Sequence, residues 1–412
     1  MVNLLRRHPV AIALVLLLLV TAIHPLPPLV DAITGSAPGD ADLERPVSYV
    51  LFAPLSNTLD ALTFFSQARA EWFLAFWIVV LGVWGALRAG DEPVSWPRRT
   101  LRIVAGPAIL IALGVAAVLL PRPVPRLVTD NGAGTVIDYH AHTRASHDGR
   151  PGWSVQQLAD WHARQGFEAS YVTDHNVIYD GTMPPEGMPI TLLPGVEWSV
   201  YGQHVIAIGP VEAVPRDSFG DNTARMVRIF TAIERQGALS IASLPEYWRN
   251  HREDLGAFVV AGVDGFEIVN CAPKALTFPS DGRRQIVELA ASHDLLVVGA
   301  SDNHGWGEVT CVWNVSQPGA QGFRTNRVFA RPLALVQGDW LPWTAPVTQG
   351  WFMMRSLSWS ERISWLTWVV IILLYRAMPR REGQTAGIGI LARSVGRPSR
   401  RSAAPTSDGT PT

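Results

Sequence analysis

The chain has 412 residues, a formal net charge of −1 at pH 7 and 48% hydrophobic residues. This length allows one large domain with additional segments, and the near-zero charge gives no indication of a nucleic-acid partner. The apolar residues gather in long blocks, which argues against a plain soluble enzyme and points to a membrane protein.

Four apolar blocks approach the roughly 20 residues that an α-helix needs to cross a bilayer. They span residues 9–23, 72–87, 103–120 and 363–375. The first also fits a cleaved signal peptide, but it ends in HPLPP without an A-x-A-like cleavage site, which favours a retained anchor. Residues 47–65 are fairly apolar too, although Asn57 and Asp60 argue against a full span and favour an interfacial or re-entrant helix.

Arginine placement predicts how these blocks are oriented. Arginines precede the first block, separate the second from the third and follow the fourth, as Arg6, Arg7, Arg88, Arg98, Arg99, Arg102, Arg376, Arg380 and Arg381. The positive-inside rule therefore places both termini in the cytoplasm and residues 121–360 outside it. We expect a multi-pass protein of the plasma (inner) membrane with an extracytoplasmic soluble domain.

These patterns divide the chain into five parts. Residues 1–120 form a membrane region with three transmembrane helices, 121–133 a Pro/Gly-rich linker, 134–345 the soluble domain and 361–379 a fourth transmembrane helix. The tail, residues 380–412, is rich in Arg, Gly, Ser and Pro and is predicted to be disordered.

Strand-like and helix-like runs alternate in the soluble domain, which predicts parallel strand pairing. Ser154 and Gln157 form a capping-box pattern at the start of a helix, and residues 221–236 and 282–292 are predicted as further helices. In folds of this kind the functional groups lie at the carboxyl ends of the strands.

The segment DYHAHTRASHDG, residues 138–149, packs three histidines and two aspartates into twelve residues. On a strand, Asp138, His140 and His142 alternate onto one face, where the two imidazoles can hold one metal ion. Similar polar residues follow or open later strand-like runs, in Thr173-Asp174-His175, Gly195-Val196-Glu197, Gly202-Gln203-His204 and Ser301-Asp302-Asn303-His304. Imidazole and carboxylate ligands suit zinc, manganese or iron.

This ordered set of motifs resembles the PHP (polymerase and histidinol phosphatase) superfamily over about residues 134–330. The resemblance implies an α/β fold, a distorted (β/α)7 barrel, here with about four transmembrane helices added. It also implies two or three divalent metal ions (Zn, Mn or Fe) and hydrolysis of phosphoesters.

The resemblance further implies a ligand set. It assigns His140, His142, Glu197 and Asp302 to a first site, Glu197 and His204 to a second, and His175 with His304 to a third. Either His147 or Asp148 adds a ligand, and we prefer His147. Glu197, as the bridging carboxylate, and Asp302 are also the catalytic candidates.

One position departs from the family pattern. Where members carry a histidine before proline, this chain reads Ala242-Ser243-Leu244-Pro245. Leu244 cannot bind metal, so the second site loses a ligand unless Glu246 or His251 replaces it.

The remaining polar residues are candidate phosphate contacts, residues that orient ligands, or residues without an expected role in the site. Arg144 is the third catalytic candidate, because its guanidinium can bind phosphate bidentately, and Lys274, the only lysine, is a weaker phosphate candidate. Asp138 and Asp174 are expected to orient ligands rather than bind metal. The other residues considered are Glu267 and Asn270, as pocket lining or core, and His162, His251 and His293, as surface or helix residues.

The sequence thus favours a membrane-anchored, metal-dependent phosphoesterase that hydrolyses a small phosphoester by metal-activated water. Its expected partners are that substrate and the lipid bilayer, with a lipid-linked phosphate as a further candidate substrate. The alternative, for which Leu244 argues, is a catalytically weakened metal-binding or sensory module. Cys271 and Cys311, the two cysteines, form either a disulfide outside the cytoplasm or two free thiols.

Overall fold

A computed structural model describes residues 8–89, 95–130, 134–181, 187–200, 202–214, 223–317 and 319–378. The chain separates into two compact units, Met1–Thr367 and Trp368–Thr412. The boundary falls inside helix α14 (Trp359–Ala377). All strands and all candidate site residues belong to the first unit. The Arg-rich tail, residues 380–412, lies outside the described residues.

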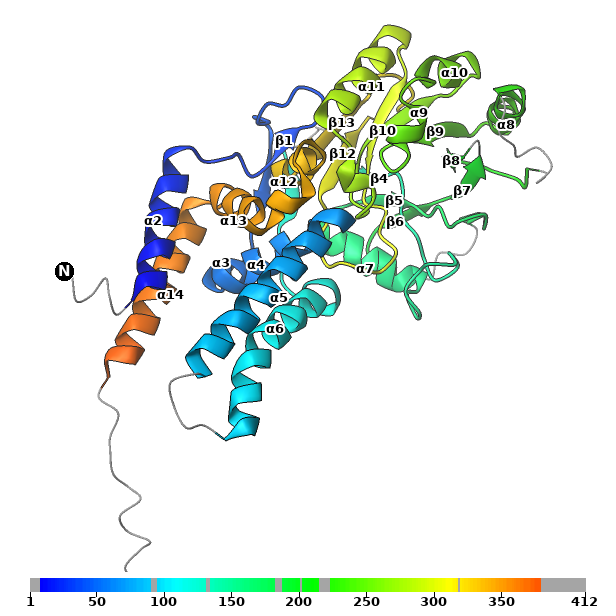
Figure 1. Cartoon of the computed structure of the whole chain (residues 1–412). Coiled ribbons are helices and arrows are strands. Elements are labelled where there is room, and N and C mark those ends of the chain that lie inside the picture. Colours follow the sequence, from blue (N-terminus) through cyan, green and yellow to red (C-terminus); the bar gives the residue numbers. More distant parts are fainter. Residues whose placement is uncertain are drawn as a thin grey trace, which may run out of the picture. The chain divides into compact units, whose positions relative to one another are not determined.

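Two mixed sheets form the centre of the first unit (Figure 1). The first has the order β1 (Val30–Asp31), β13 (Asn326–Ala330), β12 (Val312–Ser316), β4 (Thr135–Asp138), β5 (Ala169–Tyr171) and β6 (Thr191–Leu193). The second has the order β11 (Leu296–Ala300), β10 (Gly265–Asn270), β9 (Leu239–Ser243), β8 (Gln203–Ile208) and β7 (Gly195–Val200).

The two sheets meet where strands end. Isolated parallel bridges join Ala141 to Asn303 and His175 to Glu197, so the chain beyond β4 and β5 lies against the chain beyond β11 and against β7. The predicted distorted (β/α)7 barrel is found only as a mixed α/β arrangement of two sheets, and the described residues form no closed barrel. The predicted parallel pairing holds for β4–β5–β6 and β9–β10–β11, but β7–β8–β9 and β4–β12–β13 pair antiparallel, because hairpin connections replace several crossover helices.

Helices cover the sheets as the sequence predicts. α7 (Val155–Gln165) packs on β5, α8 (Thr223–Arg235) on β9, and α11 (Ser280–His293) on β10 and β11. The capping box is confirmed: the Ser154 hydroxyl accepts the Gln157 N–H, and the Gln157 side chain accepts the Ser154 N–H. Between helices and sheet lies an apolar core that fixes the strand ends carrying the polar motifs.

Helices α5 (Gln67–Ala89) and α6 (Trp96–Leu119) form an antiparallel hairpin (Figure 1). The two helices approach so closely at Gly85 that a Cβ there would lie 2.3 Å from the Arg102 carbonyl oxygen. The absence of a side chain at Gly85 permits this approach. Among the described residues these two helices are long and apolar enough to cross a membrane. A third span is obtained only if Pro342–Arg355 and Trp359–Ala377, bent by 114°, count as one.

The prediction of four transmembrane helices is therefore wrong for the described residues. Helix α2 (Pro9–Ile23) has 15 residues, or about 22 Å at 1.5 Å per residue, against a hydrocarbon core of about 30 Å. The apolar run of α14 is shortened by Glu361 and Arg362, which are buried in polar contacts.

The segments between the membrane helices and the sheets are structured. Residues 47–65 contain α3 (Val47–Leu51) and α4 (Ala53–Thr63). The segment is helical, as predicted, and neither helix is long enough to span a membrane. The predicted linker contains β3 (Arg126–Thr129), which pairs with β2 (Ala41–Glu44). It is therefore not a plain spacer in its described part.

Candidate metal centre

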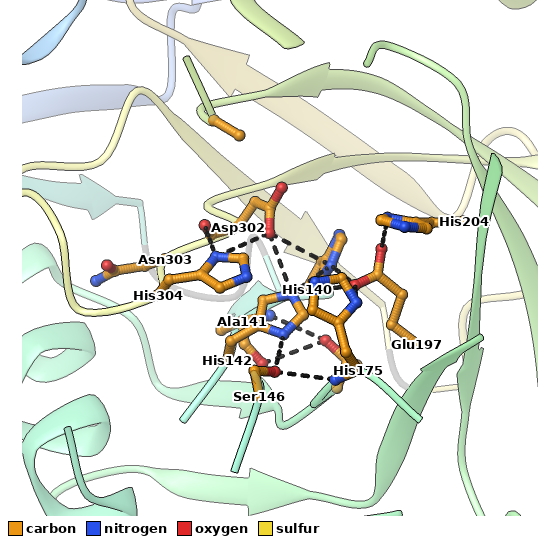
Figure 2. Close-up of polar contacts among 12 residues, drawn as sticks. His140, Ala141, His142, Ser146, His175, Glu197, His204, Asp302, Asn303 and His304 are labelled. Carbon is orange, nitrogen blue, oxygen red and sulfur yellow. Dashed lines mark hydrogen bonds and ion pairs between the residues drawn. The ribbon is translucent and has the colours of Figure 1, made fainter. Parts of the chain in front are cut away.

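Seven polar side chains from both sheets converge on one point (Figure 2). His140 and His142 follow β4, His175 follows β5, Glu197 and His204 lie in β7 and β8, and Asp302 and His304 follow β11. The bridges between the sheets bring these strand ends together. We call this group the His/carboxylate cluster: His140, His142, His175, Glu197, His204, Asp302 and His304.

At its centre, four buried atoms face one another. The Nε2 atoms of His140 and His142 are 2.8 Å apart. Asp302 Oδ1 lies 3.1 Å from His142 Nε2 and 3.5 Å from His140 Nε2. Glu197 Oε2 lies 3.3 Å from both of these nitrogens. Two imidazole nitrogens and two carboxylate oxygens, all of them potential metal ligands, therefore meet at one point.

The other members surround Glu197 and Asp302. His175 Nδ1 lies 2.8 Å from Glu197 Oε2, and His204 Nδ1 lies 2.7 Å from Glu197 Oε1. His304 Nδ1 lies 3.5 Å from Asp302 Oδ1. Glu197 therefore contacts imidazoles through both oxygens, three through Oε2 and His204 through Oε1, as a carboxylate that bridges two metal ions would.

The residues present fit a divalent metal ion. Both carboxylate oxygens of Glu197 and Asp302 Oδ1 are buried and make no regular hydrogen bond among the described residues, and their contacts are imidazole nitrogens at 2.7–3.5 Å. Leaving such acceptors unsatisfied is unfavourable, and a cation removes that penalty. Four groups of three potential ligand atoms lie within 4.8 Å of one another: His140–His142–Asp302, His175–Glu197–His204, His142–His175–His304 and His147–Asp148–His175.

Hydrogen bonds behind the imidazoles fix their orientation. Ser146 Oγ donates to Asp174 Oδ1 (3.0 Å), so it accepts from His142 Nδ1 (2.8 Å) and leaves His142 Nε2 as a free lone pair. Glu267 Oε1 lies 2.7 Å from His140 Nδ1 and has the same effect on His140. Both pairings direct the Nε2 atoms toward the cluster.

Glu267 is a candidate site residue whose role the sequence left undecided. It is fully buried, and its Oε2 accepts from Ser243 Oγ (2.5 Å) and Asn270 Nδ2 (3.1 Å). Asn270 Nδ2 also lies 3.1 Å from Asp302 Oδ2. Glu267 thus contacts His140, and Asn270 connects Glu267 to Asp302.

Asp138 and Asp174 have the orienting positions that the sequence predicts. Asp174 accepts from Thr143 N (2.6 Å) and Thr143 Oγ1 (2.7 Å), which fixes the loop after His142. Asp138 Oδ2 lies 2.8 Å from His162 Nε2. His162 is helical, as predicted, but buried rather than on the surface. Its spacing with Leu158, one turn earlier in the apolar stripe of α7, was the available signal.

Four residues proposed from the sequence lie at or beyond the edge of the cluster. The His147 side chain is 78% exposed, whereas Asp148 Oδ1 lies 3.1 Å from His304 Nε2. Asp148 therefore makes the closer contact with the cluster. Arg144 is exposed and is not among the described residues that line the cavity beside the cluster. Lys274 does line it, and its Nζ pairs with Glu246 Oε1 at 3.0 Å.

Leu244 is fully buried in the apolar core. Neither proposed substitute takes its place: Glu246 pairs with Lys274, and His251 Nε2 lies 3.4 Å from the Gly202 carbonyl oxygen. On this side of the cluster, Tyr247 OH lies 3.2 Å from His204 Nε2.

Burial and the neighbouring charged groups both shift the pKa values of the cluster residues. Burial opposes charge on His140, yet Asp302 and Glu197 hold its pKa well above the ordinary value. Burial would raise the pKa of Glu197, but His140 and further imidazole hydrogen bonds hold it well below. Burial and the neighbouring His304 lower the pKa of His142 to about 3. The carboxylates are thus ionised at neutral pH, as cation ligands must be.

A cavity of about 730 Å³ opens beside the cluster and is lined by His175, His204, Asp302 and His304. Its wall includes Cys271, which is bonded to Cys311. This disulfide confirms one of the two states that the sequence left open.

The sequence matches no protein-family profile and no characterised protein. Among solved structures, one described as a "putative metal-dependent phosphoesterase" from Bifidobacterium adolescentis is 17% identical, with a TM-score of 0.33, covering 46% of this chain and 92% of that one. An amidohydrolase from Chromobacterium violaceum is 17% identical, with a TM-score of 0.31, covering 48% and 93%. The lesion-specific endonuclease EndoQ from Pyrococcus furiosus is 13% identical, with a TM-score of 0.30, covering 44% and 51%. These TM-scores are too low to carry an argument.

Proposed function

We propose that this protein is a membrane-anchored, metal-dependent phosphoesterase. The observation that carries the proposal is the convergence of three buried carboxylate oxygens, Glu197 Oε1 and Oε2 and Asp302 Oδ1, on imidazole nitrogens. Imidazole nitrogens and carboxylate oxygens are the ligand atoms of a metal centre of this kind.

His140, His142 and Asp302 would hold one metal ion, and His175, Glu197 and His204 a second. His304, with His142 and His175, would hold a third. Zinc, manganese or iron would suit this donor set. Bound ions of this kind polarise a phosphoryl oxygen and lower the pKa of water.

The chain's own residues supply orientation and charge. Glu267 and Ser146 hold the Nε2 atoms of His140 and His142 toward the cavity. Lys274, which lines the same cavity, provides a cation for a phosphate group. Lys274 replaces Arg144 as the preferred phosphate contact, because only Lys274 is among the described residues lining the cavity.

The proposed location is the plasma membrane, with both termini cytoplasmic and the sheets outside. The α5–α6 hairpin supports membrane attachment. The Cys271–Cys311 disulfide supports an oxidising compartment for the sheets, because disulfides persist outside the cytoplasm.

The second candidate is a metal-binding or sensory module without significant turnover. The specific observation in its favour is the burial of Leu244 in apolar core, where the family pattern has a ligand.

One experiment separates these candidates. Full-length protein purified in detergent is loaded with Zn²⁺ or Mn²⁺, analysed for bound metal, and assayed on generic phosphomonoesters and phosphodiesters. Metal with chelator-sensitive hydrolysis supports the enzyme; metal without hydrolysis of either ester class supports the sensory module. Protein that takes up no metal after reconstitution contradicts both.

A further inference from the structure

The cavity beside the His/carboxylate cluster has a second wall made by the membrane hairpin. Thr63 at the end of α4, Phe64, Gln67 at the start of α5 and Val118 at the end of α6 line the same cavity as Asp302 and His304. α5 and α6 are the two described helices that are long and apolar enough to cross a membrane. The candidate metal centre therefore opens toward the end of the membrane anchor rather than away from it.

Backbone hydrogen bonds fix this arrangement. Gly307 N donates to the Val118 carbonyl (3.1 Å), and Gln67 N donates to the Pro273 carbonyl (3.1 Å). The first bond ties the loop after His304 to α6, and the second ties the loop carrying Lys274 to α5. Both loops that border the cavity are thus anchored to the same end of the hairpin.

The hairpin also has the length that places this end at a membrane surface. Arg98 and Arg99, both exposed, lie near the start of α6. About 20 residues separate them from Val118, or about 30 Å of helix, which matches the hydrocarbon thickness of about 30 Å. If the arginines lie at one surface, the cavity opens at the other.

Tryptophans gather around this end. Trp306, which lines the cavity, is 51% exposed, and Trp343 is 60% exposed on the segment that packs against α5. Tryptophan is enriched where membrane meets water, so this pattern marks the cavity mouth as interfacial.

We propose that the substrate is a membrane lipid phosphoester, whose acyl chains remain in the bilayer while the phosphate enters the cavity. This inference rests on the proposed phosphoesterase function. A small soluble phosphoester makes no use of an apolar wall of Phe64 and Val118, whereas a lipid glycerol and its first methylenes do. Lys274, on the polar side, matches the phosphate charge.

The reaction remains a hydrolysis. The water oxygen bonds to phosphorus, the P–O bond to the lipid alcohol breaks, and one proton of the water passes to the leaving alcohol oxygen while the other stays with the phosphate. No oxidant or co-reactant is needed.

The first test compares membrane-borne and soluble substrates that carry the corresponding headgroups. Metal-loaded, full-length protein in phosphatidylcholine nanodiscs is given long-chain phosphatidic acid or phosphatidylglycerol in the disc, or soluble glycerol phosphate or its short-chain ester. We expect kcat/KM to be at least about tenfold higher for the disc-borne lipid, equivalent to 1.4 kcal/mol. Equal kcat/KM for the soluble ester overturns the inference while leaving the phosphoesterase proposal intact.

The second test uses matched tryptophan variants. Trp306→Ala should lower kcat/KM on the lipid by about tenfold, since a large apolar contact at the mouth is lost, and change it less than about twofold on the soluble ester. Trp306→Phe should restore most of the loss. Trp343→Ala, exposed but absent from the described cavity lining, is the control. A loss that is equal for both substrates contradicts the inference.

A third readout does not depend on turnover. A phosphatidic acid with a photoreactive group near the glycerol is crosslinked to metal-free, full-length protein in nanodiscs, and the labelled peptides are identified. Labelling concentrated on peptides containing Phe64, Val118 or Trp306 supports the inference even if no hydrolysis is found, in which case the proposed function alone fails. Labelling spread evenly along α5 and α6 overturns it.

Discussion

Two buried groups of charged residues lie within the first unit, and they meet the penalty of burial in opposite ways. In the His/carboxylate cluster, the carboxylate oxygens face imidazole nitrogens. The second group, which we call the arginine-paired cluster, lies between α3, α4, α14 and the strands. It consists of Arg45, Tyr49, Asn57, Asp60, Arg122, Arg331 and Glu361.

In the arginine-paired cluster every carboxylate oxygen has a donor. Asp60 Oδ1 accepts from Arg122 Nη2 at 3.2 Å, and Asp60 Oδ2 accepts from Arg331 Nη1 at 3.2 Å and Tyr49 OH at 2.8 Å. Glu361 Oε1 accepts from Asn57 Nδ2 at 2.7 Å. Paired charges of this kind hold a fold together, whereas the imidazoles that face Glu197 and Asp302 can give up their protons and bind a metal ion instead.

The largest expected effect comes from removing a ligand of the His/carboxylate cluster. His140→Ala and Asp302→Ala should each lower hydrolysis by more than about a hundredfold, the upper end of what a supporting residue costs, and reduce the metal content. Each variant should unfold thermally within a few degrees of the metal-free wild type. Activity close to wild type, still abolished by chelator, would show that these ligands are misassigned.

The opposite result is expected in the arginine-paired cluster. Asp60→Ala leaves Arg122 and Arg331 without their carboxylate and should destabilise the protein by about 3–5 kcal/mol. The fraction that folds should bind metal as the wild type does. Denaturant unfolding in detergent measures the first, and elemental analysis of folded protein the second. If metal content falls while stability is kept, the division between the two clusters is wrong.

Glu267 sharpens the comparison, because it touches the His/carboxylate cluster yet has donors of its own. Glu267→Gln keeps the volume but weakens the hold on His140 Nδ1 and Ser243 Oγ. Metal affinity should fall about 10- to 100-fold, as for other residues that orient ligands. Competition with a chelating dye measures it, and Glu246→Gln, which alters a carboxylate paired with Lys274, is the control. Unchanged affinity would make Glu267 a core residue only.

The members of the His/carboxylate cluster could be proposed from sequence because strand ends are local features. His140, His175, Glu197 and Asp302 each sit at or beside an apolar run, and the fold brings such ends together. Glu267 was undecided because its partner, His140, is 127 residues away. The pairing of Asp138 with His162 was missed for a similar reason, although the helical stripe of α7 carried a hint.

The barrel and the membrane spans were over-predicted for physical reasons too. Alternating strands and helices suggest parallel closure, but the tight connection between β7 and β8 at Gly202 allows only an antiparallel hairpin. Apolar composition alone suggested four spans, whereas α2 is short and the first turn of α14 uses Glu361 and Arg362 for polar contacts.

Leu244→His tests the departure from the family pattern. An added imidazole on the side of His204 should raise metal content or affinity at the second site, because a neutral imidazole can complete a coordination shell. The structure sets a competing cost, since Leu244 is fully buried among apolar side chains. Elemental analysis and thermal unfolding follow the two effects separately. Lower stability without gain in metal would mean that the position does not face the cluster.

The smallest expected effect is a pH dependence that distinguishes His304 from the paired charges. Burial opposes the charge of His304, but its hydrogen bond to Asp148 and the charge of Asp302 raise its pKa to about 9. A raised pKa means that protonated His304 stabilises the metal-free fold below about pH 6.5, and that this contribution is lost as the pH rises through about 9.

Metal binding at His304 must displace the same proton, so affinity for a site that uses it should rise by up to about tenfold per pH unit between pH 7 and 9. Calorimetry in buffers of different ionisation enthalpy should detect up to one proton released through His304, and His304→Gln should abolish that share. Affinity independent of pH over this range would remove His304 from the ligand set and leave its contact with Asp148 as a structural ion pair, of the kind that the arginine-paired cluster already contains.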